Sequence, residues 1–490
     1  MKMKAMLYCV IAALFVLVTV AKMPKVSAHH TKHQQYKVVI FPPDGGPFSF
    51  FAGYLNYDTL TDRGTAGVAS ASGNSYTWND GKQTNLEPLP QLANLTGTST
   101  FINWINQWGL SAGYGTRTDP NGASFDHAAI WTPDGHIFPL RTPDGYQSHA
   151  VWVNDYGVAS GWIENATRYS CAFGVGVQNE SQAVIWQFGF RRMLGTLGGD
   201  NSYGEFINNR GQVSGHSEIS TVINGCPAID PFVWEDGKMI DILPGDFGGA
   251  FGGTNFLSNG GHAVGFGTLP GDAFSYAFLW HGGKLTNLTN VGTLGGSMDS
   301  AFNSNDEGAV VGVSSVSDDS AFHAVMWRDG TFTDLGTVDG DACSQPYRIN
   351  SHDQVVGFSG ACDFSVQHAS LWEDGEGVDL NSLIPANSGV QLLSANWINE
   401  RGEIATLGIL AADGTFRAVL LIPEGEDDFD QQDDSAAIKG AAITGHSAQG
   451  IASGATKGAP LKLKDASGRL NPMYLRPFSP AKLRNNRPAQ

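Results

Sequence analysis

Seven aspartates stand in short polar stretches between apolar runs, which is where loop side chains can gather to bind or react. Carboxylates brought together in this way can supply the oxygen ligands of calcium, or an acid and a base that cleave a glycosidic bond. Solvated loop aspartates are the ordinary alternative. The set is Asp119, Asp126, Asp272, Asp318, Asp319, Asp363 and Asp413. We take Asp272, Asp318, Asp319 and Asp363 as candidate binding residues, with calcium as the one candidate cofactor.

The short motifs of several common sites are missing from the chain. An EF-hand loop, Gly-x-Ser-x-Gly, His-Glu-x-x-His and a phosphate-binding Gly-Lys-Ser/Thr are all absent. The sequence therefore assigns no catalytic residue and no metal ligand.

The positions of these aspartates follow from a repeat, of which Leu194 to Leu243 is one copy. A Gly-Gly turn leads to Ile-Asn-x-x-Gly, then to an apolar run, a variable loop, a run ending in Trp, an x-Asp-Gly turn and a last apolar run. We read this copy as four strands, a to d, joined by a tight a–b turn, a loose b–c loop and a tight c–d turn. The Trp landmark recurs at Trp78, Trp131, Trp186, Trp234, Trp280, Trp327 and Trp372, with Leu421 in the eighth position.

The repeat predicts an all-β protein. Steps of roughly 45 to 55 residues are typical of four-stranded propeller blades. The segment 36–41 resembles a d strand, whereas the eighth copy stops after strand c near Ile422. We therefore expect an eight-bladed β-propeller of four-stranded antiparallel blades, closed into a ring by the N-terminal strand; an open solenoid is the alternative.

The tryptophans separate into two groups by their place in the repeat. Those that end strand c share one register, so we expect them to wedge between blades. The others are off that register and are better candidates for exposure, although such residues are still more often part of the core: Trp104, Trp108, Trp152, Trp162 and Trp397.

Four cysteines follow the N-terminal segment, and an even number in a secreted chain suggests pairing. Cys171, Cys226 and Cys362 lie in b–c loops and Cys343 in a d–a loop. Both kinds of connection emerge on one face of a propeller, so we predict the disulfides Cys171–Cys226 and Cys343–Cys362. Zinc is the rival, but no Cys-x-x-Cys spacing supports it.

The two ends of the chain differ from the repeats. Residues 1–28 have the form of a secretory signal peptide, with an uncleaved anchor as the alternative. Residues 29–423 are the predicted propeller, and 424–490 form a tail that is acidic, then rich in Ala, Gly and Ser, then basic, which predicts disorder. Removing the four lysines of residues 1–28, which contain no acid, lowers the net charge from -18 to -22. That charge argues against nucleic-acid binding.

The motifs also carry a resemblance. Leu-Gly-Thr-Leu-Gly-Gly and Ile-Asn-x-x-Gly-Gln-Val-x-Gly, within Leu194 to Gly215, and His-Ala-x-x-Trp, at His323 to Trp327, resemble the HAF family of extracellular repeat proteins. The resemblance covers about 36 to 422 and is strongest in the fourth to seventh copies. It implies a secreted repeat protein and no particular activity.

These observations favour a secreted, monomeric, non-catalytic propeller. We expect it to bind a glycan or protein through the face that carries the b–c and d–a loops, because loops on a rigid scaffold commonly bind partners. An extracellular polysaccharide hydrolase or lyase that uses the loop carboxylates is the first alternative. A structural surface protein is the second.

Overall fold

The computed structural model describes residues 33–42, 49–54, 57–70, 74–92, 94–169, 178–187, 189–223, 225–243 and 249–425. Nearly all regular structure in these ranges is β, apart from the single 3-10 turn η1 (Leu380–Leu383). None of the helical structure found there is long and apolar enough to cross a membrane. The segments 1–28 and 426–490, with the predicted signal peptide and tail, lie outside the described residues.

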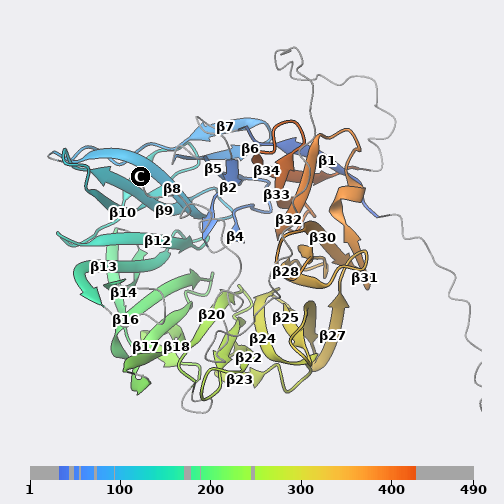
Figure 1. The fold of residues 1–490 in the computed structure, drawn as a ribbon. Helices are drawn as coiled ribbons and strands as arrows, with labels where there is room; N and C mark the ends of the chain where they lie inside the picture. Colours follow the sequence, from blue (N-terminus) through green and yellow to red (C-terminus); the bar gives the residue numbers. More distant parts are fainter. Residues whose placement is uncertain are drawn as a thin grey trace, which may run out of the picture. The chain divides into compact units, whose positions relative to one another are not determined.

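The strands form six four-stranded antiparallel sheets, one eight-stranded sheet and a two-stranded hairpin among the residues described (Figure 1). The eight-stranded sheet consists of two antiparallel quartets joined by a single parallel bridge, Ser275 to Met298. Each quartet follows the predicted order a, b, c, d along the chain, except where the N-terminal strand takes part.

The first four quartets span residues 49 to 241. The first has β2 (Ser49–Phe51), β5 (Ala66–Ser70), β6 (Ser75–Asn79) and β7 (Lys82–Asn85), with the hairpin β3 (Gly53–Tyr54) and β4 (Tyr57–Asp58) inserted. The second has β8 (Thr96–Ile105), β9 (Ser111–Thr118), β10 (Ser124–Trp131) and β11 (Ile137–Pro139). The third has β12 (Gln147–Val153), β13 (Ala159–Tyr169), β14 (Gln178–Gln187) and β15 (Phe190–Gly195). The fourth has β16 (Gly198–Ile207), β17 (Val213–Ile223), β18 (Cys226–Glu235) and β19 (Lys238–Asp241).

The remaining quartets are more regular. The fifth has β20 (Gly252–Leu257), β21 (Ala263–Thr268), β22 (Ser275–His281) and β23 (Lys284–Asn287). The sixth has β24 (Gly295–Ser304), β25 (Val310–Val316), β26 (Phe322–Arg328) and β27 (Thr331–Gly336). The seventh has β28 (Cys343–Ile349), β29 (Val355–Gly360), β30 (Gln367–Glu373) and β31 (Glu376–Asp379). The last is β32 (Val390–Ile398), β33 (Ile404–Leu410) and β34 (Phe416–Pro423), completed by β1 (Tyr36–Ile40).

The predicted pairing of the chain's first strand with its last is confirmed. β1 runs antiparallel to β34, with Val38 opposite Leu421 and Ile40 opposite Val419. Tyr36 and Phe41 at the ends of this segment are buried. Strand β1 therefore covers an edge of β34 that would otherwise expose unpaired backbone groups.

The c–d turns explain the repeated Asp-Gly. In the turn between β26 and β27, both Asp329 (φ 50°) and Gly330 (φ 75°) have positive φ. Two central residues with positive φ match the right-handed twist of a hairpin, and Asp and Gly adopt that conformation at low cost.

The strand-c tryptophans pack between quartets, as the repeat predicted. Trp131, Trp186 and Trp327 are almost fully buried. The indole nitrogens of all three donate to backbone oxygens of the preceding quartet's last segment, at 2.8 to 3.0 Å. Each such tryptophan therefore joins two sheets by packing and by one directed bond.

The predicted disulfide Cys343–Cys362 is present, with the two Cα atoms 5.1 Å apart. Cys343 is the first residue of β28, and Cys362 lies in the loop between β29 and β30. Cys226 is also disulfide-bonded, whereas its predicted partner Cys171 lies outside the described residues.

Candidate functional site

The aspartates expected to bind a ligand lie in the b–c loops, as predicted, and they hold those loops together. Asp272 Oδ1 accepts hydrogen bonds from the Ala250 amide (2.8 Å) and the Thr268 hydroxyl (2.6 Å). Asp319 accepts from the Ser297 amide and from two serine hydroxyls, at 2.7 to 2.8 Å. Both aspartates have positive φ, a backbone conformation typical of turns. Their contacts favour a structural role.

Asp318 and Asp363 form a second, more exposed pair of loop aspartates. Each accepts hydrogen bonds from the amide and hydroxyl of the serine two residues later, Ser320 and Ser365. These hydrogen bonds lower the pKa of both carboxyls. In the described part of the chain, no three His, Cys, Asp or Glu side chains are grouped so as to hold a metal ion. Calcium stays a prediction that nothing here tests.

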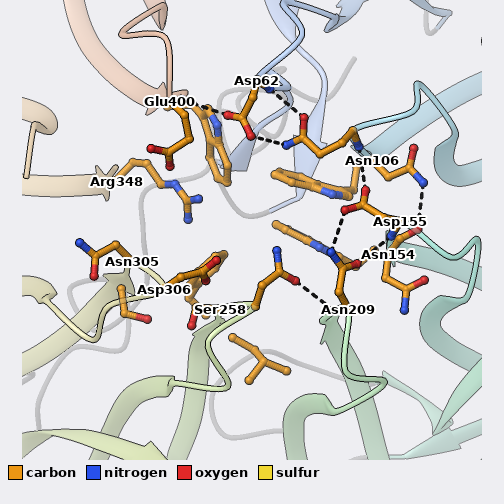
Figure 2. Close-up of a pocket in the computed structure, with 18 of the residues that line it drawn as sticks. Asp62, Asn106, Asn154, Asp155, Asn209, Ser258, Asn305, Asp306, Arg348 and Glu400 are labelled. Atoms are coloured by element: carbon orange, nitrogen blue, oxygen red, sulfur yellow. Dashed lines mark hydrogen bonds between the residues drawn. The ribbon is translucent and has the colours of Figure 1, made fainter. Parts of the chain in front are cut away.

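The structure contains a pocket of about 340 Å³ at a different place, where the a strands end and the a–b turns begin. Seven quartets contribute the last residues of strand a, and all eight contribute to the turns or strand ends that line it. Figure 2 shows how these turns converge around the space. The pocket therefore lies at the a–b turns and not among the b–c loops.

Aromatic side chains from several a strands form the inner surface of this pocket. Trp104 and Trp152 stack with ring centroids 3.5 Å apart, and Trp397 meets Trp104 edge-on at 4.8 Å. The ring centroids of Phe256 and Trp152 are 6.1 Å apart. Trp152 and Trp397 are buried and Trp104 is partly buried, which is the core role that off-register tryptophans more often have. Aromatic packing fills the space where the a strands approach one another.

Arg348 is the single cationic side chain among the residues that line the pocket. Its guanidinium lies over Trp397, 3.9 Å from the ring centroid, and over Phe256 at 4.7 Å. It also donates to Asn303 Oδ1 at 3.0 Å. In Figure 2 this side chain extends toward the interior near Glu400. Cation–π contacts on two rings fix the guanidinium in place.

The first residue of six of the a–b turns is an Asn that links neighbouring quartets. Asn106 Nδ2 donates to the Asn154 carbonyl oxygen at 2.9 Å, and Asn154 Nδ2 donates to Asn208 O at 3.0 Å. Asn208 continues the series to Ser258 O at 3.1 Å. A second series runs from Asn305 to Asn350 (3.3 Å), from Asn350 to Asn399 (3.2 Å) and from Asn399 to Thr61 (2.9 Å). We call these bonds the asparagine belt.

The second residue of each turn adds a parallel set of links around the pocket (Figure 2). The Gln107 amide donates to Asp155 Oδ1 at 3.0 Å, and Asn209 Nδ2 donates to Asp155 Oδ2 at 2.7 Å. Asp62 Oδ1 accepts from the Glu400 amide at 3.0 Å, and its Oδ2 accepts from Gln107 Nε2 at 2.7 Å. Both oxygens of Asp62 and of Asp155 are thus used to hold neighbouring turns in register.

The pocket is acidic. Five carboxylates line it, against the one guanidinium: Asp62, Asp155, Asp306, Glu307 and Glu400. Burial raises the pKa of Asp62, and the charge of Glu400 raises it further, while its hydrogen bond and nearby arginines act in the opposite direction. Such a wall repels anions and favours uncharged or cationic ligands.

Sequence reasoning recognised the turns but missed the pocket. In several copies of the Ile-Asn-x-x-Gly motif, the Asn and the residue after it line the cavity, as Asn106 and Gln107 do. The available signal is the residue two positions before the turn, which is Trp in three copies: Trp104, Trp152 and Trp397.

Comparison with known proteins gave no family. No family model matches the chain, and no curated protein matches it. Among solved structures it is similar to dipeptidyl peptidase 4 of Porphyromonas gingivalis, with 10% identity, a TM-score of 0.45 and coverage of 73% of this chain and 58% of the peptidase. An oligogalacturonate lyase in complex with manganese matches at 12% identity and a TM-score of 0.40, over 81% of this chain and 96% of the lyase. The Trypanosoma rangeli sialidase matches at 11% identity and a TM-score of 0.27, over 79% of this chain and 59% of the sialidase.

Proposed function

We propose that the chain is an eight-bladed propeller closed into a ring by β1. Each quartet is hydrogen-bonded through its a–b turn to the next one, and the last returns to the first through Asn399 and Thr61. The first meets the second through Asp62 N and Gln107 Oε1 (3.0 Å), and the fifth meets the sixth through Gly260 N and Asp306 Oδ1 (2.9 Å). A cyclic set of links supports a ring over an open solenoid.

We infer further that this ring is a secreted, non-catalytic binding protein. Its ligand is a polar, uncharged or cationic group of an extracellular partner, held in the pocket at the a–b turns. The observation that carries this proposal is a cavity of about 340 Å³ that combines an aromatic inner surface with convergent amides and carboxylates. Ligand sites in proteins have this mixture of apolar area and a few placed polar groups.

The contacts of the carboxylates favour binding over catalysis. A general acid or base must exchange protons with the substrate during the reaction. Asp62 and Asp155 already accept protein hydrogen bonds on both oxygens. Glu400 accepts the Ser351 amide through Oε2 at 3.0 Å. Side chains held in this way present fixed acceptors to a ligand.

The test compares two variants, one that removes a charged side chain in the pocket and one that removes a charged side chain on the b–c loops. Purified protein is screened by calorimetry against neutral oligosaccharides, amines and peptides, as wild type, Glu400→Gln and Asp363→Asn. We expect Glu400→Gln to weaken binding roughly tenfold, the usual effect of losing a hydrogen bond to a charged group, and Asp363→Asn to leave it unchanged. The opposite pattern would move the site to the b–c and d–a loop face.

A second candidate function is polysaccharide cleavage in the same pocket. The supporting observation is the raised pKa of Asp62 beside a second carboxylate, Glu400, since paired carboxyls of this kind can act as acid and base. The same screen therefore monitors product formation. Turnover that disappears in both Asp62→Asn and Glu400→Gln would replace the binding proposal with this one.

A further inference from the structure

Two exposed aromatic side chains stand beside the pocket, on neighbouring a–b turns. Trp108 is 57% exposed and Tyr156 is 72% exposed. Each follows directly after a residue that lines the pocket, Gln107 and Asp155. The Gln107 amide donates to Asp155 Oδ1 at 3.0 Å, which holds the two turns side by side.

Both aromatic residues are anchored by their backbones. The Trp108 amide donates to Asn106 Oδ1 at 3.0 Å, and the Tyr156 amide donates to Asn154 Oδ1 at 3.1 Å. The Arg63 guanidinium lies 4.2 Å from the centroid of the Trp108 ring. Rigid turns thus display two large aromatic rings to solvent beside the pocket.

We propose that Trp108 and Tyr156 form a stacking platform for the pyranose rings of an uncharged glycan, one end of which enters the pocket. This inference rests on the proposed binding function and names its ligand class. A pyranose has one face of C–H bonds, which packs on an aromatic ring, and hydroxyls at its edge, which need hydrogen-bond partners. The platform supplies the first contact, and the pocket amides and carboxylates supply the second.

Charge decides which glycans fit. The pocket carries five carboxylates and one guanidinium, so a uronate would meet a repulsive wall. Arg401, on the rim of the last quartet, is paired with Glu403 at 2.6 Å. At the end that enters the pocket, neutral hexose or pentose chains therefore suit the site better than acidic ones.

The experiment measures the affinity of the purified protein for cellohexaose, xylohexaose, mannohexaose and an oligogalacturonate. At least one neutral hexasaccharide should bind, with quenching or a shift of tryptophan fluorescence, and the oligogalacturonate should not. Trp108→Ala and Tyr156→Ala should each weaken binding roughly three- to tenfold, whereas Tyr156→Phe, which keeps the ring, should bind like the wild type.

The matched control is Phe190→Ala. Phe190 is 69% exposed and lies under Arg141 at 5.5 Å, which resembles the Arg63–Trp108 arrangement, but it belongs to the d strand β15. Thermal melting of every variant shows that the fold is intact.

Three results would overturn the platform. In the first, neutral glycans bind equally to wild type, Trp108→Ala and Tyr156→Ala. In the second, the oligogalacturonate binds as well as the neutral chains. In the third, no neutral glycan binds while an amine or peptide binds in a Glu400-dependent manner, which would leave the binding function standing. Absence of binding by every class of ligand would remove both proposals.

Discussion

At the scale of single residues, carboxylates in this chain divide between loop formation and the pocket wall. The loop aspartates were identified from the sequence because Asp in a polar stretch between strands is visible there. Their roles depend on partners that are distant in sequence, such as Ser297 for Asp319, 22 residues away. Composition and spacing predict that a carboxylate lies in a loop. Its hydrogen bonds within the protein decide whether it is available to bind a ligand.

Asp230, on β18, is a partly buried carboxyl that neither forms a loop nor lines the pocket, and its burial is unfavourable to the charged form. Burial, with a smaller contribution from Asp241, raises its pKa to about 7. The folded state therefore holds this proton between about pH 4 and 7, where the unfolded chain has lost it. Its contribution to stability is full below pH 4 and declines as the pH rises through 7.

We predict that Asp230→Asn stabilises the protein at pH 8, by up to about 4 kcal/mol, and has little effect at pH 4. Chemical denaturation from pH 4 to 8 measures both values. Asp80→Asn, in an exposed c–d turn, is the control. Equal effects of Asp230→Asn at pH 4 and 8 would contradict the assignment.

At the scale of elements, the a strands and their turns position the pocket. The repeat predicts where each strand begins and ends, because Gly and Asp-Gly turns are visible in sequence. It does not predict which face carries a cavity. That depends on whether inward side chains fill the space. Four copies have Trp or Arg at the position where the others have Phe, Asn or Thr: Trp104, Trp152, Arg348 and Trp397.

The asparagine belt predicts a specific weak point in the turns. Asn154 is buried; its Nδ2 reaches Asn208 O, and its Oδ1 accepts the amides of Tyr156 and Val158. Asn154→Ala should lower the free energy of unfolding by about 2–4 kcal/mol, because three backbone groups lose a partner, two of them in buried hydrogen bonds. Asp119→Ala, which breaks a similar but exposed b–c turn, should cost much less; chemical denaturation of both variants provides the comparison. Equal losses would show that the belt contributes no more than an ordinary turn.

At the scale of the whole molecule, the first strand completes the last sheet. The sequence predicted this from one d-like segment without an a strand before it and one repeat without a d strand after it. The pairing register between β1 and β34 bears out the prediction. The number of blades and the closed ring remain proposals, because a repeat fixes local sheets more directly than it fixes how many surround an axis.

Deleting residues 1–41, which removes β1, should lower the melting temperature by roughly 10 °C or more and promote association, since β34 is left as a bare edge. Deleting residues 1–34 leaves β1 in place and is the matched control. Melting curves and size-exclusion chromatography read out the two effects. If both truncated proteins have the same melting temperature and stay monomeric, β1 does not stabilise the last sheet.

The asparagine belt is discontinuous, and its gaps give the molecule a preferred way to come apart. Asn106 to Asn208 form one run and Asn305 to Asn399 another, while Ser258 and Thr61 have no amide with which to reach the next turn. Ser258 instead contacts His262, and Thr61 Oγ1 accepts the amide of Thr65, each within its own turn. Local opening of the native protein should therefore begin at the seam between the first and second quartets, because the fifth and sixth are also joined by the Ser275–Met298 bridge and by Asn255 Nδ2, which donates to Ala301 O at 2.8 Å. Backbone amides at the first seam would exchange with solvent before those at the other seams.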